Sequence, residues 1–282
     1  MILIADSGST KTHWCLAEHG EILTEVFTKG MNPFFQTETE MQDEVRLNLL
    51  PRLPQDKMPV AIYFYGAGCT PEKAGLVRDV LTKLFPHTRR IEVQSDMVGA
   101  AHAVCGFQPG IACILGTGSN SCLFDGNQIV SNVSPLGFIL GDEGSGGVLG
   151  KLLIGALLKN QLTPGLKEEF LDRHGLTQAE ILDRVYRRPF PNRFLASLSP
   201  FLLEHIDDPS IHQLVLNAFR DFFRRNVAQY ENYSQYLVGF VGSVAWYYRK
   251  VLSEAARLEG IQLGLVVPDP IQELVKLLSV EK

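Results

Sequence analysis

Two short turns rich in glycine and hydroxyl side chains are the residues best suited to chemistry. Residues 6–12 follow an apolar run and read Asp-Ser-Gly-Ser-Thr-Lys-Thr. Residues 116–120 also follow an apolar run and read Gly-Thr-Gly-Ser-Asn. Glycine lets backbone N–H groups approach an anion closely, and hydroxyl and ammonium groups add donors. Together the two turns predict a site that holds a polyphosphate from opposite sides.

Taken singly, each turn is also compatible with a structural role, since Gly, Ser and Thr are common in tight turns. The Walker A pattern of a P-loop is absent. In the nucleotide interpretation, the ATP phosphates contact both turns, through Ser7, Gly8, Ser9, Thr10, Lys11, Thr12, Gly116, Thr117 and Gly118. Asp6, at the end of the first strand, would hold Mg²⁺ mainly through water.

A third glycine junction, Gly242-Ser243, follows the strand-like residues 237–241 and precedes a helical run. Its backbone suits an adenosine and its ribose. The same pattern is equally typical of a tight turn between a strand and a helix.

The elements that position these turns occur in a repeated order. Residues 2–5, 13–17 and 21–28 predict three antiparallel strands joined by short turns. The same order of strand, glycine turn and strand occurs again, with the strands at residues 111–115 and 121–124 and the turn between them. A unit used twice predicts a duplicated molecule with two lobes, residues 1–108 and residues 109–282.

Helices alternate with further strands along the chain, which predicts α/β layering. Additional strands are expected at residues 61–65, 91–94, 128–131, 237–241 and 266–267. Helices are expected at residues 71–84, 97–104, 151–159, 166–174, 178–186, 194–205, 211–230, 244–258 and 270–279.

Composition excludes several classes of protein. The 282 residues carry 26 Lys and Arg against 31 Asp and Glu, a formal charge of −5, which argues against nucleic-acid or anionic-membrane binding. An apolar fraction of 45% argues against disorder. No apolar stretch is long enough for a membrane helix, and no signal peptide is evident. Five cysteines without a Cys-x-x-Cys pair indicate reduced thiols and a cytoplasmic protein.

Three motifs in order carry a family resemblance. Residues 6–12, 116–120 and 141–146 (Gly-Asp-Glu-Gly-Ser-Gly) resemble the phosphate-1, phosphate-2 and G-D-E-G-S motifs of N-acetylglucosamine kinases. Those enzymes belong to the BadF/BcrA-type ATPases of the actin-like ATPase and sugar kinase superfamily. The resemblance spans nearly the whole chain, to an adenosine-type motif at residues 239–245. It implies a two-lobed α/β fold of the actin-like (ribonuclease H-like) type, with duplicated mixed β-sheets flanked by helices and a cleft between.

The resemblance also implies roles for single residues. Asp96 falls at the catalytic carboxylate, which accepts the proton of the attacking sugar hydroxyl. The sugar would be contacted by Asn32, Asn120, Asp142 and Glu143. Structural alternatives are a helix N-cap at Asp96, an Asn-Pro turn at Asn32 and a loop-shaping role for Glu143.

The implied activity is phosphorylation of an amino sugar by ATP and Mg²⁺, with N-acetylglucosamine as the expected small-molecule substrate and a homodimer left open. Leu136 stands where some N-acetylhexosamine kinases carry Trp, so N-acetylmuramic acid is an alternative substrate. A rival of another class is a reductase-activating ATPase, which needs cysteines to hold an iron–sulfur cluster. A sugar-sensing module without turnover is a third alternative, against which Asp96 and Lys11 argue.

Overall fold

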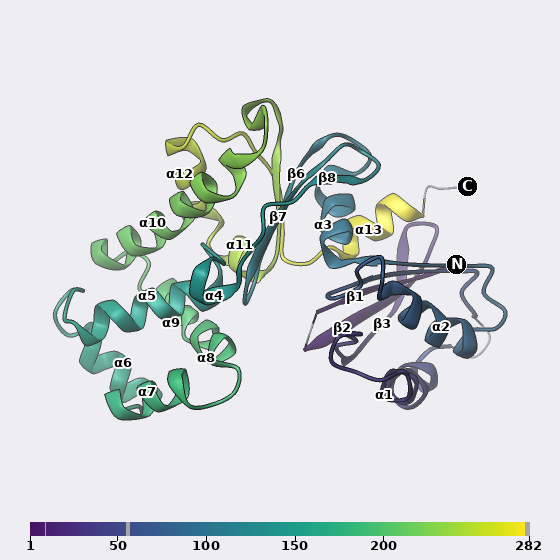
Figure 1. The fold of residues 1–282 in the computed structure, drawn as a ribbon, viewed down its shortest axis with the longest axis horizontal. Helices are drawn as coiled ribbons and strands as arrows, with labels where there is room; N and C mark the ends of the chain where they lie inside the picture. The colour runs from purple at the N-terminus through teal and green to yellow at the C-terminus, as the bar shows by residue number, and fades with distance from the viewer. Residues whose placement is uncertain (9, 55–56, 280–282) are drawn as a thin grey trace. The chain divides into compact units, whose positions relative to one another are not determined.

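Two five-stranded mixed sheets organise the chain, each inside its own compact unit (Figure 1). The computed structural model describes residues 1–8, 10–54 and 57–279. The first unit comprises Met1–Gln108, Gly126–Gln128 and the chain from Asp269 onward. The second comprises Pro109–Asp125 and Ile129–Pro268. The predicted contact of Ser9 with phosphate lies outside the described residues.

The sheet of the first unit has the order β3-β2-β1-β4-β5. Strands β1 to β3 form the predicted antiparallel meander, and β4 and β5 continue the sheet in parallel with β1. The strands are β1 Ile2–Ser7, β2 Lys11–Glu18, β3 Glu21–Lys29, β4 Ala61–Gly66 and β5 Arg90–Ser95.

Helices cover both faces of this sheet, as the alternation of side chains along β1 requires. Leu3 and Ala5 pack in the core with Trp14 and Phe64 and with the helices α1 and α2. Ile4, fully buried, points to the other face, where α3 and α13 pack on the sheet and on each other. These helices are α1 Glu38–Glu44, continued by Val45–Leu49 and Leu50–Arg52, α2 Ala74–Leu84, α3 Asp96–Cys105 and α13 Ile271–Leu278.

The last helix corrects the expected lobe boundaries. Residues 109–282 were predicted to form one lobe, yet α13 belongs to the first unit, as does Gly126–Gln128. The amphipathic pattern of α13 buries Ile271, Leu274 and Val275. That pattern shows that the helix has an apolar face, but not which sheet the face covers.

The sheet of the second unit repeats the plan of the first, which confirms the predicted duplication. Its order is β10-β9-β6-β7-β8, with an antiparallel meander of β6, β7 and β8 and parallel strands β9 and β10 beside β6. The strands are β6 Gly110–Leu115, β7 Ser119–Phe124, β8 Ile129–Ser131, β9 Val238–Val241 and β10 Leu263–Val267.

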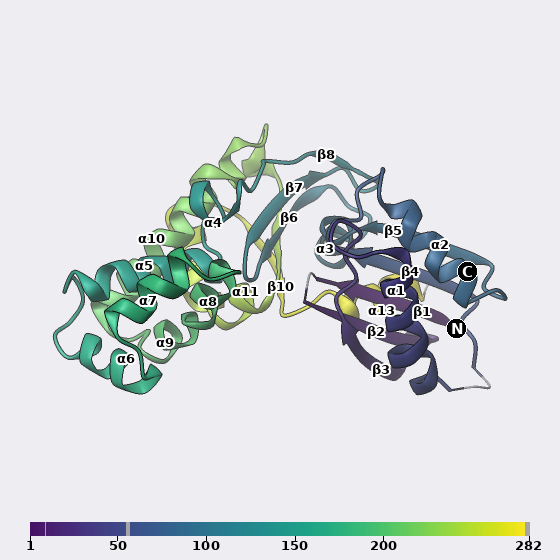
Figure 2. The same ribbon diagram turned by 60° about the horizontal axis from the view of Figure 1, so that its bottom comes forward.

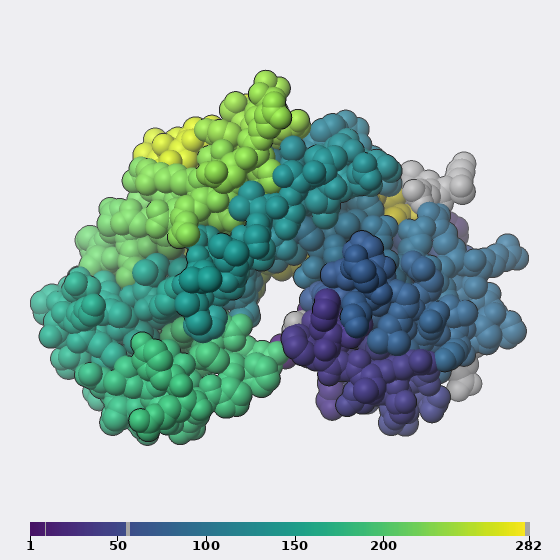
Figure 3. All heavy atoms as spheres, viewed as in Figure 1, coloured from purple at the N-terminus to yellow at the C-terminus, as the bar shows by residue number. Residues whose placement is uncertain are grey.

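Nine α-helices are described in the second unit, and Figure 2 shows most of them gathered beside its sheet. The core that they bury is rich in phenylalanine. Figures 1 and 3 place α6 and α7 at the end of this unit farthest from its sheet. The helices are α4 Gly137–Leu140, α5 Gly146–Leu158, α6 Leu166–His174, α7 Gln178–Tyr186, α8 Pro191–Ser197, α9 Ser199–Glu204, α10 Pro209–Arg225, α11 Ser243–Tyr247 and α12 Arg249–Leu258. Within the described part of the chain, none of the helices combines the length and apolar character needed to cross a bilayer.

Five predicted helices have other bounds in the structure. The helix expected at 71–84 begins at Ala74, and the one expected at 151–159 begins at Gly146. The other three divide or end early. The run 194–205 divides into α8 and α9 because Pro200, in the first turn of α9, lacks the N–H that would continue the helical ladder. The run 244–258 divides into α11 and α12 at Tyr248. The run 211–230 ends as an α-helix at Arg225, where the Asn226 side chain donates to the carbonyl of Phe222.

Candidate active site

The first glycine turn is a tight hairpin between β1 and β2. Ser7 pairs with Thr12 across the strands, and the Gly8 N–H donates to the Lys11 carbonyl at 3.0 Å. The hydroxyls of Ser7 and Thr12 lie 2.7 Å apart and have no exposed surface. Ser7 Oγ also accepts from the Met31 N–H at 2.9 Å. These two hydroxyls therefore hold the turn together, whereas Gly8, Thr10 and Lys11 are exposed and open to a ligand.

Asp6 places a carboxylate beside this turn, on the sheet face opposite to Ser7. Burial first, and then the negative charges of Asp96 and Asp269, raise the pKa of Asp6 to about 7, while Lys11 opposes the shift. Two other carboxylates of the first unit thus act on Asp6. Such oxygen donors are the ligands that Mg²⁺ prefers, and a bound cation would relieve their repulsion. The residues present fit an ion held by one carboxylate and water.

Asp96 is the first residue of α3, immediately after β5. The N-cap is Ser95, whose hydroxyl accepts from the Val98 N–H at 3.4 Å. The alternative that Asp96 caps the helix is therefore wrong. Asp96 Oδ1 accepts from its neighbour's N–H, that of Met97, at 2.9 Å. Burial raises the pKa of Asp96, and backbone N–H groups partly offset this effect. A carboxylate with a raised pKa is a better proton acceptor than an ordinary one.

Asn32 is buried in the loop after β3. Its Oδ1 accepts from the Phe34 N–H at 3.0 Å, and its backbone N–H donates to Gln36 Oε1 at 2.8 Å. Gly68 lies directly against it, because a Cβ there would stand 2.4 Å from Asn32 Oδ1. The Asn-Pro turn is thus present, and contact with a sugar stays a prediction.

The second glycine turn, in the second unit, is held by the start of α5. The N–H groups of Gly146 and Gly147 donate to the carbonyls of Gly116 and Thr117 at 2.8 and 3.0 Å. Gly116 also donates to the Gly118 carbonyl at 2.9 Å. Two of the predicted motifs, 116–120 and 141–146, therefore form one structural site.

Asp142 joins the same turn. It has a left-handed backbone, with φ at 54°, and its Oδ1 accepts from the Ser119 N–H at 3.2 Å. Burial raises the pKa of Asp142, and the Ser119 N–H lowers it. Asn120 Oδ1 accepts from the Ser121 N–H and from Asn132 Nδ2. Asp142 and Asn120 therefore flank the turn at which the resemblance expects the sugar.

Glu143 is turned toward α10 instead. One carboxylate oxygen lies 2.7 Å from Arg225 Nη1, and the other accepts from Asn226 Nδ2 at 3.1 Å. The residue is 8% exposed. These contacts support the alternative in which Glu143 shapes the loop. The sequence contained no signal for Arg225 and Asn226, because they are remote in the chain and lie at an ordinary helix end.

Gly242 and Ser243 lie where β9 leads into α11. Gly242 has φ at 126°, and a Cβ there would meet the Leu115 carbonyl oxygen at 2.2 Å. Its N–H donates to the Val267 carbonyl at 3.0 Å. Glycine is therefore required by the packing of β9 on β6 and β10. Ser243 is exposed, and its contact with adenosine stays a prediction.

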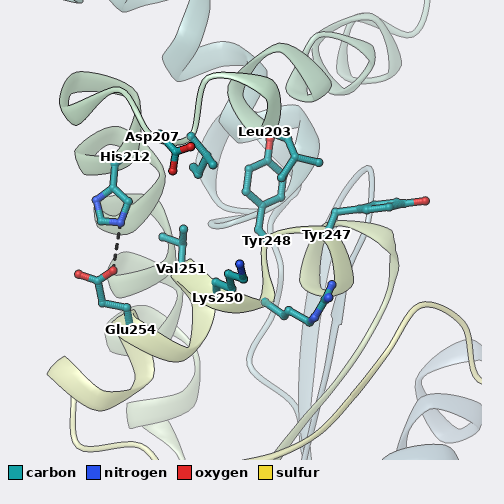
Figure 4. A pocket seen from close by; sticks show the side chains of 10 residues that line it. Leu203, Asp207, His212, Tyr247, Tyr248, Lys250, Val251 and Glu254 are labelled. Carbon is teal, nitrogen blue, oxygen red and sulfur yellow. Dashed lines mark hydrogen bonds and ion pairs between the residues drawn. The ribbon is translucent and has the colours of Figure 1, made fainter.

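A cavity of about 360 Å³ lies elsewhere in the second unit (Figure 4). It is lined by residues of α9 and the turn after it and of α10, α11 and α12, and no predicted site residue is among them. His212 Nε2 lies 3.0 Å from Glu254 Oε2. Figure 4 marks this contact with a dashed line. Tyr248 donates its hydroxyl to the Ser199 carbonyl. This cavity therefore lies apart from the candidate site.

The duplicated sheets, each carrying a glycine turn between its first two strands, define the fold of the actin-like ATPases and sugar kinases. No family model matches the chain, and no curated protein does. The chain does match solved structures. A Porphyromonas gingivalis protein named "Putative N-acetylglucosamine Kinase" is 53% identical, with a TM-score of 0.96, over 100% of this chain and 99% of that one. The chain belongs to this N-acetylglucosamine kinase family.

Two more distant structures share the fold alone. A protein of the same name from Chromobacterium violaceum is 21% identical, with a TM-score of 0.74, over 99% of this chain and 98% of that one. A ROK family glucokinase from Streptomyces griseus, in complex with glucose and AMPPNP, is 14% identical, with a TM-score of 0.59. This match covers 98% of the present chain and 97% of the glucokinase chain.

Proposed function

We propose that this protein transfers the γ-phosphoryl group of ATP to the 6-hydroxyl of N-acetylglucosamine. The observation that carries the proposal is Asp96, a half-buried carboxylate with a raised pKa at the start of a helix. The relative that is 53% identical over the whole chain supports the choice of substrate through its name.

The reaction needs one proton acceptor and two phosphate-binding turns. The sugar oxygen attacks the γ-phosphorus, its proton passes to Asp96, and the bond from the γ-phosphorus to the bridging oxygen breaks as ADP leaves. Lys11 and Thr10 on the first turn and Thr117 on the second bind the phosphates. Magnesium supplies charge neutralisation when bound, and Asp6 is the residue that would hold it.

The sugar hydroxyls would be fixed by Asp142 and Asn120, which flank the second turn. Leu136 adjoins this site in the chain: it is 59% exposed, and a Cβ on Gly141 would meet its Cβ at 3.1 Å. An exposed aliphatic side chain here suits an acetamido methyl group. It leaves N-acetylmuramic acid as the second substrate to be tested.

The reductase-activating alternative is not favoured by the cysteines. Cys113 and Cys122 are fully buried in β6 and β7. Burial raises the pKa of Cys15 and of Cys69 to about 12, which disfavours the thiolate that a metal cluster needs.

The decisive experiment is a coupled assay of ADP release with a panel of sugars. We expect turnover with N-acetylglucosamine and a product phosphorylated on the 6-hydroxyl, shown by NMR. ATP turnover that is equal with and without sugar would contradict the kinase assignment. Turnover only with N-acetylmuramic acid would replace the substrate but keep the reaction.

The proposal also covers the cellular compartment and the oligomeric state. Five cysteines without a Cys-x-x-Cys pair suit a reducing cytoplasm, the compartment in which we place the protein. A homodimer is also proposed, and sedimentation equilibrium tests it.

A further inference from the structure

A cationic cavity of about 300 Å³ lies beside the first glycine turn, inside the first unit. Its walls come from the turn, from the edge strand β3 and from the segment after α1. It is lined by Thr10, Lys11, Phe27, Thr28, Lys29, Glu44, Asn48 and Arg52. Three cationic side chains and one carboxylate thus share one hollow.

Lys11 and Lys29 lie so close that their positive charges repel each other, which a purely structural role does not explain. Lys11 on β2 pairs directly with Lys29 on β3. Like charges directly opposite each other on neighbouring strands destabilise a sheet. A lysine on an edge strand discourages edge-to-edge association. That purpose accounts for Lys29 but not for a second lysine facing it.

The remaining contacts organise the cavity without neutralising it. Lys11 Nζ lies 4.6 Å from the centre of the Phe27 ring, and Arg52 Nη1 donates to the Phe27 carbonyl at 3.3 Å. The Glu44 carboxylate accepts from the backbone N–H of Lys29 at 2.9 Å. In the described ranges, Lys11, Lys29 and Arg52 form no ion pair with a carboxylate.

We propose that this cavity binds a phosphate group, as inorganic phosphate or as a phosphate monoester. The Arg52 guanidinium and the two ammonium groups supply charged donors, and Thr10 and Asn48 supply neutral ones. Arg and Lys together are the usual recognition set for a phosphate. The volume also admits the sugar of a phosphosugar.

A bound phosphate here has a consequence that rests on the proposed function. Lys11 is shared between this cavity and the turn assigned to the ATP phosphates. A phosphate in the cavity draws the Lys11 side chain to itself and so weakens ATP binding. The product of the reaction, a sugar phosphate, is one monoester that would act in this way.

The direct test measures binding without turnover. Isothermal titration of the full chain with inorganic phosphate, and separately with N-acetylglucosamine 6-phosphate, is compared with the double variant Lys29→Gln, Arg52→Gln. We expect the variant to bind phosphate at least about tenfold more weakly, since it loses two charged donors to the phosphate oxygens. Arg46→Gln is the matched control, because Arg46 is exposed on the same segment, pairs with Asp43 and does not line the cavity.

The outcomes separate this site from the ATP site. If phosphate binding is lost in Thr117→Ala and kept in the double variant, the phosphate occupies the ATP turns and the proposal is overturned. Equal binding in the wild type and the double variant overturns it as well. Binding of only one probe identifies free phosphate or phosphosugar as the source. Because no step involves turnover, a failure of the kinase assignment would leave this result intact.

Discussion

At the scale of single residues, burial in the first unit raises the pKa values of two carboxylic acids. Asp6 and Asp96 both have raised pKa values, chiefly because of burial, and the charge of Asp96 raises the pKa of Asp6 further. Their roles differ in the proposal, since Asp96 accepts a proton and Asp6 holds a cation.

Replacing Asp96 by Asn tests the proton acceptor. The amide keeps the shape and most of the hydrogen bonding but does not take up the proton. We expect kcat to fall by about 10²–10⁴-fold, the usual contribution of a general base. Sugar affinity, measured by titration calorimetry, should change by no more than a few-fold. A near-normal kcat in Asp96→Asn would refute the catalytic assignment. Ser95→Ala is a useful comparison, because it removes the true N-cap and should affect stability more than kcat.

The raised pKa of Asp6 predicts a particular pH dependence of stability. The ordinary value is 3.8 and the folded value is about 7, so the fold prefers the protonated acid. This preference stabilises the fold at low pH, and the benefit is lost as pH rises from about 4 through about 7. We therefore expect the Tm of the wild type to fall relative to that of Asp6→Asn over this window. Adding Mg²⁺ above about pH 7 should restore part of the loss in the wild type only. Parallel Tm curves for both proteins would contradict the shift.

At the scale of elements, periodicity and turn residues predicted most of the fold. The helices α6 and α7 begin and end at the predicted residues, because a Gly or Thr precedes each and the apolar spacing is regular. The strands of both meanders also lie where apolar runs between turns placed them. Helix α1 was not predicted, although Thr37 and Glu40 form a capping box, a signal that was present in the sequence.

Tertiary contacts account for what the sequence did not reveal. The pairing of Glu143 with Arg225 and Asn226 joins residues of a loop and a distant helix end. The buried hydroxyls of Ser7 and Thr12 look, in sequence, identical to exposed ones. Whether a hydroxyl in a glycine turn faces solvent depends on strand register, which only the folded sheet decides.

Two glycines of α5 offer a matched test of how this helix packs. A Cβ at Gly150 would lie 1.9 Å from the Leu195 carbonyl oxygen of α8, whereas a Cβ at Gly155 meets nothing within 4 Å. We expect Gly150→Ala to destabilise the protein by about 1–3 kcal/mol through overpacking. Gly155→Ala should stabilise it by about 0.5–1 kcal/mol, because alanine favours a helix. Urea denaturation measures both. Similar effects of the two changes would show that α5 and α8 do not pack closely.

At the scale of the whole molecule, each unit is assembled from segments that are not contiguous. The first unit is completed by the end of the chain, where α13 contacts α3 and β1. The Asp269 carboxylate accepts from the Ile271 N–H at the start of this helix, and it also raises the pKa of Asp6. The last helix therefore contributes both to the packing of the first unit and to the electrostatics of its site.

A mutation that creates a cavity beside α13 tests whether this helix stabilises the first unit as a whole. Leu274 has no exposed surface, so Leu274→Ala should cost about 2–5 kcal/mol of stability. Hydrogen exchange should then increase in β1, β2 and α3 of the first unit, while α10 of the second unit stays protected as the internal control. Exchange that increases in α13 alone would show that the helix is an appendage rather than part of the first unit's core. An equal increase in both units would show that they unfold together, which contradicts their assignment as separate cooperative units.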